Sequence, residues 1–375
     1  MKFSQPASPV RIGIVGCGNV MDGAYMPAID KLRRSGEPVE VVAACHTSAA
    51  KCNAVLAKWQ IPHFTTDYRE LVTSHQVDLV LVLTSMASHG VITRAALEGG
   101  KHVLVEKPMA TTLEEAAQLV DLARESPGYL VAAPFVILSS TYQTIWKRVH
   151  RGDIGRVLNA RARYGWAGPD WGEWFYRHGG GCLFDLAVYN IASLTGLLGP
   201  ARRVMAMTGT AILERQVQGR SLHAEAEDNA HVLIDFGNSV LAAVTTGFTL
   251  QKYRSPAVEL YGTEGTLQML GDDWAPNGYE LWQNKVGAWQ CYEETDPFWS
   301  WTDGLRHLVE CIQTKVRPII TPEHAFHVLE IMIAAKLSGQ DGEAKQIRST
   351  FKPLAVAEKA EEQLQAHRIH DRRRE

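Results

Sequence analysis

A charged pair that ends an apolar run is the first candidate for chemistry. Residues 102–105, His-Val-Leu-Val, are typical of a buried strand, and Glu106, Lys107 and Pro108 follow at once. Proline cannot continue a central strand and holds the preceding residue extended, so we expect Lys107 to be fixed at the strand end. In a parallel sheet this end lies at the carboxyl edge, where such sheets bind ligands. The alternative is a solvated Glu–Lys pair without a function.

A carboxylate and a phenol form the second candidate group. Asp185 and Tyr189 are four positions apart in a predicted helix that runs to residue 198, so they project from one face. The three glycines at 179–181 let the chain pass close to a flat ligand. Buried groups of this kind need partners. They suit acid–base chemistry, or they form an Asp–Tyr hydrogen bond that only fastens two elements.

A glycine turn follows the first predicted strand, residues 11–15. Gly16 permits the tight turn, Gly18 lets the backbone approach a pyrophosphate, and Asn19 and Val20 open the next helix. The N-terminus of that helix would bind the pyrophosphate of a dinucleotide. The third position of the fingerprint is Met21 rather than Gly or Ala, so the motif is incomplete. A βα turn with two structural glycines explains it as well.

The second predicted strand, residues 39–45, ends where NAD-binding proteins carry an Asp or Glu for the adenine ribose. This chain has His46, Thr47 and Ser48 there, and Lys51 follows. No carboxylate is present to repel a 2′-phosphate, and hydroxyl, imidazole and ammonium groups could bind one. We therefore favour NADP over NAD. The alternative is that these residues only cap the helix that begins near Ser48.

A third predicted strand, residues 77–83, places Thr84, Met86 and His89 on the same edge of the sheet as Glu106. We expect all three to contact the cofactor. His89 opens a helix, so it either bonds the phosphate or ribose or is an ordinary first-turn residue.

Aromatic side chains gather at residues 164–176, within a polar, Gly-rich segment. Trp166, Trp171 and Trp174 suit the wall of a sugar site, or they anchor a loop. Arg177 would suit an anionic sugar, and a salt bridge is the other explanation for it.

Strands and helices alternate over residues 1–135, which predicts a doubly wound parallel sheet of the Rossmann type. Residues 136–354 begin with a helix at 139–151 and continue with strands at 157–164, 204–210, 230–236, 239–250, 257–261 and 265–270. This pattern predicts an α+β domain with a large, mostly antiparallel open sheet. Helices follow at 301–314 and 321–339, and residues 355–375 form a charged tail. The predicted fold class is therefore α/β, with two domains.

The composition excludes several classes of function. The 375 residues carry a net charge of -3, which gives no electrostatic footprint for nucleic acid. No apolar run approaches ~20 residues, so we expect no membrane span, and the first residues lack the apolar core of a signal peptide. The six cysteines form no C-x-x-C pair. We therefore expect reduced thiols, no metal site and a cytoplasmic protein.

Four motifs together resemble the Gfo/Idh/MocA oxidoreductases: the glycine turn, HVLVEKP, the D-x-x-x-Y-N run at 185–190, and RPIITPEHAFHVLEIMIAA at 317–335. The resemblance covers about residues 11–353 in the family's order. It implies a Rossmann domain, a cleft for NAD(P) and a sugar-like substrate, and a homodimer or homotetramer formed through the C-terminal sheet. Many members carry D-x-G-x-H where this chain has Ala187 and Tyr189. Tyrosine there resembles the branch that includes glucose-fructose oxidoreductase and dimeric dihydrodiol dehydrogenase.

The resemblance implies hydride transfer between nicotinamide and a secondary hydroxyl or carbonyl of a sugar, polyol or glycoside. Lys107 matches the family's catalytic lysine. Tyr189 would move the proton, with Lys107 favouring its phenolate or polarising the carbonyl. Asp185 would orient the substrate or keep Lys107 charged, and Glu106 would anchor the cofactor ribose. Two alternatives remain, namely a glycosidase or lyase that oxidises the sugar transiently with tightly bound NAD, and a non-catalytic nucleotide sensor.

Overall fold

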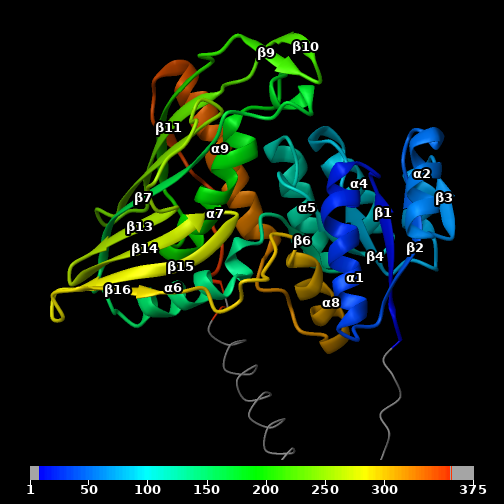
Figure 1. Ribbon diagram of the computed structural model, residues 1–375, viewed down its shortest axis with the longest axis horizontal. Helices are drawn as coiled ribbons and strands as arrows, with labels where there is room; N and C mark the ends of the chain where they lie inside the picture. The colour runs from blue at the N-terminus through cyan, green and yellow to red at the C-terminus, as the bar shows by residue number, and fades with distance from the viewer. Residues whose placement is uncertain (1–7, 355, 357–375) are drawn as a thin grey trace, which may run out of the picture.

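The computed structural model describes residues 8–354 and 356, and it leaves out the side chains of residues 50–54. The described chain forms two large sheets with helices packed between and around them (Figure 1). Apart from residue 356, the predicted charged tail at 355–375 lies outside the described residues. None of the described helices is long and apolar enough to cross a membrane.

The first sheet has six parallel strands in the order β3-β2-β1-β4-β5-β6. They are β1 (Val10–Val15), β2 (Val39–Cys45), β3 (His63–Thr65), β4 (Leu79–Val82), β5 (His102–Val105) and β6 (Leu130–Ala132). The strand order reverses between β1 and β4, and sheets of this kind bind ligands beside the carboxyl ends at such a point. The predicted Rossmann topology is confirmed.

Five helices connect these strands: α1 (Met26–Arg34), α2 (Ala49–Trp59), α3 (Tyr68–Thr73), α4 (His89–Glu98) and α5 (Leu113–Glu125). The last of them begins directly after its capping residue, Thr112. The hydroxyl of Thr112 accepts a hydrogen bond from the backbone N–H of Glu115 at 3.2 Å, which satisfies one of the free donors of the first turn.

The second sheet has nine strands in the order β16-β15-β14-β13-β7-β12-β11-β8-β17. They are β7 (Val157–Gly165), β8 (Arg203–Gly209), β11 (Asn229–Asp235), β12 (Leu241–Gly247), β13 (Val258–Gly262), β14 (Gly265–Asp272), β15 (Ala275–Gln283), β16 (Trp289–Tyr292) and β17 (Lys345–Gln346). Neighbouring strands are antiparallel except β7 and β12, which are parallel. A separate hairpin, β9 (Glu214–Val217) and β10 (Arg220–His223), projects beyond the sheet.

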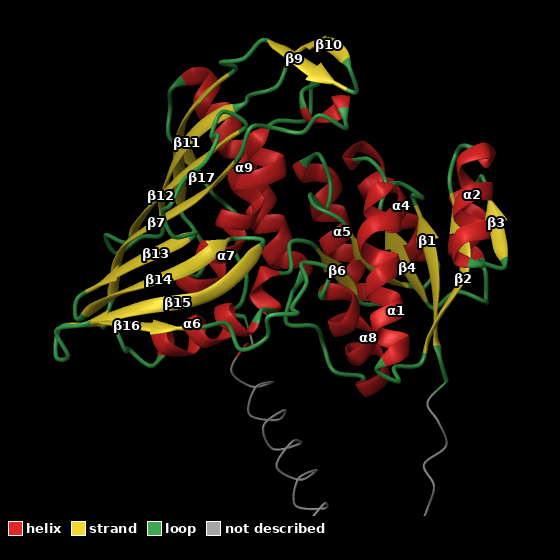
Figure 2. Cartoon of the chain, in the orientation of Figure 1, coloured by secondary structure: helices red, strands yellow, loops and turns green. Residues whose placement is uncertain are grey.

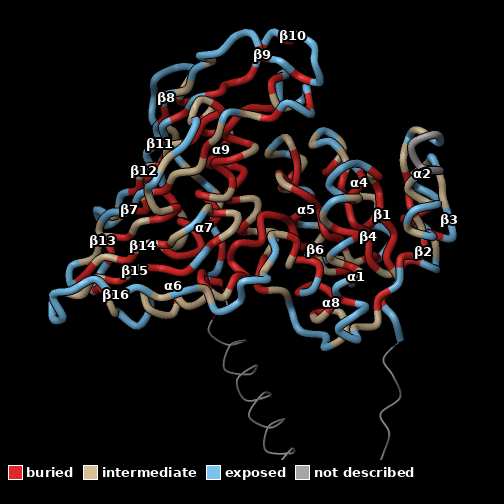
Figure 3. The backbone as a smooth tube through the Cα atoms, in the orientation of Figure 1, coloured by how far each residue is buried: buried red, intermediate tan, exposed pale blue. Residues whose placement is uncertain are grey.

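Helices cover one face of the second sheet. They are α6 (Ser140–His150), which contacts β14 and β15, α7 (Val188–Leu198), which contacts β7, β12 and β13, and α9 (Pro322–Asp341), which contacts β8. This helical layer separates the two sheets (Figure 2). Every second side chain of β8 and β11 is exposed, so the opposite face of the sheet is open. Buried residues concentrate where α7, α9 and β6 meet (Figure 3).

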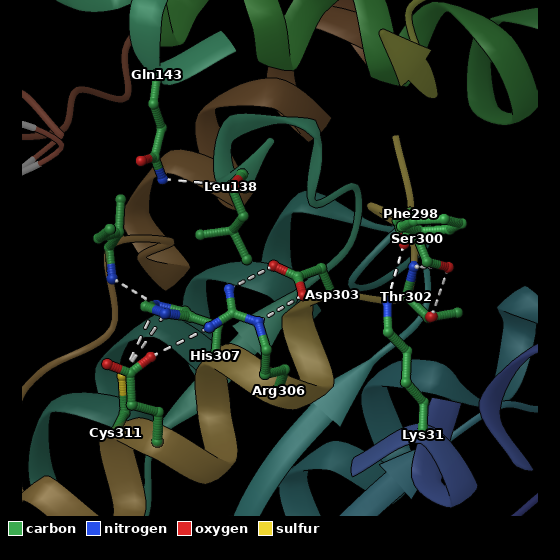
Figure 4. A network of polar contacts seen from close by, with 12 residues as sticks. Lys31, Leu138, Gln143, Phe298, Ser300, Thr302, Asp303, Arg306, His307 and Cys311 are labelled. Atoms are coloured by element: carbon green, nitrogen blue, oxygen red, sulfur yellow. Dashed lines mark hydrogen bonds and ion pairs between the residues drawn. The ribbon is translucent and has the colours of Figure 1, made fainter. Parts of the chain in front are cut away.

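Near its end the chain returns to the first sheet, where α8 (Gly304–Thr314) packs against β5 and β6. Figure 4 shows the polar contacts that fix the preceding segment. The ammonium group of Lys31 donates to the carbonyl oxygen of Phe298 at 2.9 Å, and Arg306 donates to both carboxylate oxygens of Asp303 at 2.7 Å. Residues 298–303 are therefore fastened both to α1 and to α8.

Several elements differ from their predicted bounds. β4 is shorter than the predicted strand at 77–83, because the chain leaves the sheet at loops that retain apolar residues. β3, β9, β10, β15, β16 and β17 were not predicted. β3 and β17 are too short to show a period, and β15 begins with Pro, Asn and Gly, which are rare in strands.

Candidate active site

Lys107 lies directly after β5 and reaches across to the helix layer of the second sheet. Its ammonium group donates to Asp185 Oδ1 at 2.5 Å and to the Asp185 carbonyl oxygen at 2.9 Å. The two side chains are only 15% and 13% exposed, so water screens this pair far less than a surface pair. The peptide bond between Lys107 and Pro108 is cis. The contact between Lys107 and Asp185 joins two motifs that lie 78 residues apart in the sequence.

The helix that carries Asp185 and Tyr189 begins as a π turn, Leu183–Ala187, and continues as α7. Single π turns are frequent at functional sites. Both side chains line the same cavity, and the Lys107 ammonium lies 5.5 Å from the centre of the Tyr189 ring. The Tyr189 hydroxyl makes no hydrogen bond within the described part of the chain, so no Asp–Tyr bond fastens the helix here.

The phenol of Tyr189 is held in its neutral form. Burial raises its pKa well above the ordinary value, and the carboxylates of Glu106, Asp185 and Asp273 raise it further. We expected Lys107 to favour the phenolate. The surroundings do the opposite, because the ammonium group is already paired with Asp185 and nearby carboxylates repel a second negative charge.

Glu106 is 8% exposed and turns towards Tyr25. The Tyr25 hydroxyl donates to Glu106 Oε1 at 2.6 Å, and the backbone N–H of Lys107 donates to Oε2 at 3.2 Å. Tyr25 also packs edge-on against Trp301, with ring centres 6.0 Å apart. The sequence analysis missed Tyr25 because it follows the glycine fingerprint in the π turn Met21–Tyr25, where no motif marks it.

A cavity of about 460 Å³ opens beside Lys107, between the first sheet and the second. Its walls are mainly aromatic, and Trp166 and Trp171 stack with their ring centres 5.3 Å apart. The lining residues are Lys107, Tyr164, Gly165, Trp166, Trp171, Phe175, Asp185, Leu186, Tyr189, Gln251, Lys252, Tyr253, Asp272, Trp274 and Trp301. Aromatic walls with a few polar groups are typical of sites for small molecules.

Two of the predicted wall residues do not line this cavity. Trp174 is 48% exposed and packs on Phe175, with ring centres 5.1 Å apart. Arg177 forms ion pairs with Glu225 at 3.1 Å and Glu173 at 3.4 Å. The salt-bridge explanation of Arg177 therefore agrees with the structure, and the placement of both residues in the substrate wall does not.

The sequence analysis missed the lining residues from the second half of the chain. Asp272 and Trp274 lie in the turn between β14 and β15, and Lys252 and Tyr253 lie in the loop after β12. Trp301 comes from the segment that leads to α8. The sequence Gly-Asp-Asp-Trp at 271–274 follows a predicted strand, so paired carboxylates at a strand end were an available indication of a site.

The glycine turn after β1 suits a dinucleotide. Gly16 has φ +104°, and a Cβ there would lie 2.5 Å from the Leu83 carbonyl oxygen, so only glycine fits. A Cβ at Gly18 would meet no atom within 4 Å, which leaves open space over the backbone. Asn19 and Val20 are exposed at the helix start. The free N–H groups of a first helical turn are the usual place for a pyrophosphate.

At the end of β2 the structure has the predicted polar residues. The backbone N–H of Ser48 donates to His46 Nδ1 at 2.9 Å, and among the described groups the Ser48 hydroxyl makes no capping hydrogen bond to α2. The cofactor and cap interpretations of these residues both stay predictions. Thr47 is exposed, and the side chain of Lys51 lies outside those that the structure describes.

His89 does not face the cofactor site. It is 1% exposed, and its ring nitrogens contact the carbonyl oxygens of Pro108 at 2.7 Å and Thr84 at 3.0 Å. Both polar atoms of the ring are thus engaged by backbone, so the expected bond to phosphate or ribose is wrong. Thr84 and Met86 are partly exposed after β4.

The described residues contain no group of three or more His, Cys, Asp and Glu side chains that could hold a metal ion. Ionisable groups of the site form hydrogen bonds with one another: Lys107 donates to Asp185, and Tyr25 donates to Glu106.

Comparison with known proteins identifies relatives along most of the chain. Residues 10–133 match the model of an oxidoreductase family with an NAD-binding Rossmann fold, and residues 142–268 match the GFO/IDH/MocA C-terminal domain. The 1,5-anhydro-D-fructose reductase of Ensifer adhaerens is 28% identical over 90% of this chain and 99% of its own length. The trans-1,2-dihydrobenzene-1,2-diol dehydrogenase of Macaca fascicularis is 28% identical over 71% of this chain and 76% of its own.

The crystallised levoglucosan dehydrogenase, in complex with NADH and levoglucosan, has the same fold. Its TM-score is 0.79 at 18% identity, over 91% of this chain and 100% of its own. Two family models that together cover more than half of the chain, and a Lys–Asp–Tyr group at the expected edge of the sheet, lead to one assignment. This chain belongs to the GFO/IDH/MocA family of oxidoreductases, with an NAD-binding Rossmann fold, and its relatives include sugar reductases and dehydrogenases.

Proposed function

We propose that the protein transfers a hydride between nicotinamide and a secondary hydroxyl or carbonyl of a sugar, polyol or glycoside. One observation carries this proposal: Lys107, Asp185 and Tyr189 line one aromatic cavity at the carboxyl edge of the first sheet. A nicotinamide cofactor would supply or accept the hydride there. Gly16, Gly18, Asn19 and Val20 would hold its pyrophosphate, and Glu106 its ribose.

Lys107 and Tyr189 have separate tasks in this proposal. Lys107 donates two hydrogen bonds to Asp185 and retains a third N–H, with which it polarises the substrate oxygen. Tyr189 is neutral, so it donates a proton to the oxygen as a carbonyl is reduced. Asp185 positions Lys107 and accepts from a neighbouring substrate hydroxyl. Trp166 and Trp171 give the ring a flat apolar wall.

For the cofactor we favour NADP over NAD. His46, Thr47 and Ser48 end β2 without a carboxylate, and among the described groups the Ser48 hydroxyl makes no capping bond. The levoglucosan dehydrogenase structure holds NADH, and it shares only the fold with this chain. The test is fluorescence titration of the purified protein with NADPH and NADH, in which NADPH should bind at least several-fold more tightly. Tighter NADH binding would show that the absence of a carboxylate at the end of β2 does not predict NADP in this protein.

The reaction is tested by absorbance at the reduced-nicotinamide band, with a panel of sugars, inositols and glycosides and each cofactor. Net reduction or oxidation of added cofactor by one sugar class would establish a freely exchanging dehydrogenase or reductase. Glycoside cleavage without added cofactor and without net redox change would favour the glycosidase or lyase. Binding of cofactor with no reaction of any panel member would favour the nucleotide sensor.

We also propose that the protein forms a homodimer, or a homotetramer, through the open face of the second sheet. Exposed apolar side chains gather there, namely Met205, Met207, Leu233 and Leu241, which are 43%, 79%, 60% and 51% exposed. Leu233 pairs with Met205 across β11 and β8, so these side chains share one face. Apolar patches of this kind mark association surfaces.

A further inference from the structure

The end of the cavity formed by the loop after β12 and the end of β14 has polar groups that hydride transfer does not use. Asp272 ends β14 and lines the cavity together with Gln251, Lys252 and Tyr253. The Tyr253 hydroxyl donates to Asp272 Oδ1 at 3.1 Å. No hydrogen bond or ion pair to Asp272 Oδ2, or to the ammonium group of Lys252, is recorded for the described part of the chain. An acceptor and a donor are thus left for a ligand.

Tyr164 of β7 lines the same cavity as Asp272, Tyr253, Asp185 and Tyr189. Its ring packs edge-on against that of Tyr189, with ring centres 5.6 Å apart. Burial raises the pKa of Tyr164, and Tyr189, Asp185, Asp272 and Tyr253 raise it further. A ligand that contacts Tyr164 beside the reacting groups therefore has Asp272 in the same cavity.

The turn that carries Asp272 is anchored to the helix of the reacting groups. The next residue, Asp273, is fully buried, and its two carboxylate oxygens accept from Ser193 Oγ and Asn190 Nδ2, both at 2.6 Å. Asn190 directly follows Tyr189 in α7. Since these contacts fix the turn against α7, Asp272 and Trp274 keep a constant position relative to Tyr189.

The chemistry of this end selects a neutral polyhydroxyl group. A carboxylate and an ammonium group that line the same cavity suit a ligand that donates to one and accepts from the other, as sugar hydroxyls do. A phosphate would be repelled by Asp272. The cavity of about 460 Å³ lies within the range of roughly 300 to 1,000 Å³ that holds drug-sized ligands. It also has more aromatic wall than a single ring can cover, in Trp166, Trp171 and Trp274.

We propose that Asp272, oriented by Tyr253, forms a distal subsite that binds the hydroxyl groups of a second sugar ring. The preferred substrates are then glycosides of at least two rings, with the oxidised or reduced carbon in the ring beside Lys107. This inference rests on the proposed function and names the substrate class of the same site.

The test compares one-ring and two-ring probes by direct binding. D-glucose is paired with cellobiose and with maltose, and D-galactose with lactose. Each is titrated into protein saturated with oxidised cofactor while tryptophan fluorescence is followed, because several tryptophans line the cavity. At least one two-ring probe should bind about 10-fold more tightly than its one-ring partner, the gain expected of a hydrogen bond to a charged group.

Asp272→Asn should remove this gain and leave the affinity for the one-ring probe unchanged. Tyr253→Phe, which keeps the ring, should reduce the gain by a few-fold, and it serves if Asp272→Asn does not fold. Glu293→Gln removes one negative charge from an exposed position outside the cavity and should change neither affinity.

Three results would overturn the subsite: equal affinity for both members of every pair, a gain that survives Asp272→Asn, or an equal loss for one-ring and two-ring probes. If none of the probes binds saturably, the proposed saccharide subsite is wrong. Binding needs no turnover, so an Asp272-dependent gain without any redox reaction would refute the proposed function and keep the subsite. Turnover of sugars without the gain would do the reverse.

Discussion

At the residue scale, the site depends on which hydrogen-bond donors of the Lys107 ammonium group are left for a ligand. Asp185 engages its ammonium group twice, once through the carboxylate and once through the backbone carbonyl. One N–H of the ammonium group is left to donate a hydrogen bond to a ligand in the cavity. A buried ion pair of this kind costs stability if either partner is removed, so its variants need a check of folding.

Lys107→Ala should lower turnover by about two to four orders of magnitude, because the polarising cation is lost from the substrate oxygen. Cofactor affinity should remain within a few-fold of the parent. Steady-state kinetics and cofactor titration measure the two effects. Lys285→Ala, at an exposed turn, is the matched control and should be silent. Near-normal turnover in a folded Lys107→Ala protein would remove this residue from the mechanism.

Tyr189→Phe should lower turnover in the direction of carbonyl reduction by about 100-fold or more, because the donated proton is absent. The ring is retained, so its edge-on contact with Tyr164 at 5.6 Å should keep the thermal midpoint close to that of the parent. Kinetics and thermal unfolding on the same preparation separate the effects. A change in the midpoint alone would assign Tyr189 a purely structural part.

At the element scale, α7 is the part that holds the site together. Its first turns carry Asp185 and Tyr189, and its next polar residues, Asn190 and Ser193, bind Asp273 from the β14–β15 turn. Burial raises the pKa of Asp273 to about 6, although the hydrogen bonds from Ser193 and Asn190 oppose that effect. One helix therefore positions both ends of the cavity, at the cost of a buried carboxylate.

Asp273→Asn should increase the free energy of unfolding, and more so at high pH. The folded pKa of about 6 lies above the unfolded value near 3.8, so the parent loses stability as pH rises from about 4 to about 6. The amide has no such loss and can also donate to Asn190 Oδ1, a buried acceptor without a partner among the described residues. The gain should be roughly 1 kcal/mol larger at pH 7.5 than at pH 5.

Denaturant unfolding at both pH values measures this gain. Asp170→Asn, at an exposed position, is the control and should show the same small effect at pH 5 and pH 7.5. If Asp273→Asn lowers the free energy of unfolding equally at pH 5 and pH 7.5, burial does not raise the pKa of this carboxylate.

At the scale of the whole molecule, two sheets are held apart by one helical layer, and the far face of the second sheet is open. The exposed side chains of β8, β11 and β12 on that face include the apolar group around Leu233. Covering it with a second copy would bury this group without changing the cavity, which lies on the helical side.

Leu233→Arg should therefore shift the protein towards monomer, because a charge at the centre of an apolar interface is left unpaired when the interface closes. Size-exclusion chromatography with light scattering measures the mass. Val286→Arg places the same charge at an exposed turn residue of similar exposure, 50% against 60%, and should leave the mass unchanged. A monomeric parent protein would contradict the proposed association.

The sequence by itself determined the features that depend on neighbouring residues. Gly16 with its positive φ, the end of β5 before Pro108, and the placement of Asp185 and Tyr189 on one helical face follow from local geometry. They were sufficient for the fold class, whereas the contact of Lys107 with Asp185 was expected only from the resemblance to a family. Resemblance to a family added the chemistry that these groups perform.

Only the tertiary structure decided what surrounds them. Tyr25 and Trp301 come from two distant segments, and no period or motif marks them. Asp272 follows a predicted strand, but only the fold brings it to the cavity. His89, at the same edge as the site, is turned inward to two carbonyl oxygens, and Arg177 is paired on the surface. A side chain's direction in a loop depends on long-range packing and on which partner is nearest, and the local sequence does not encode either.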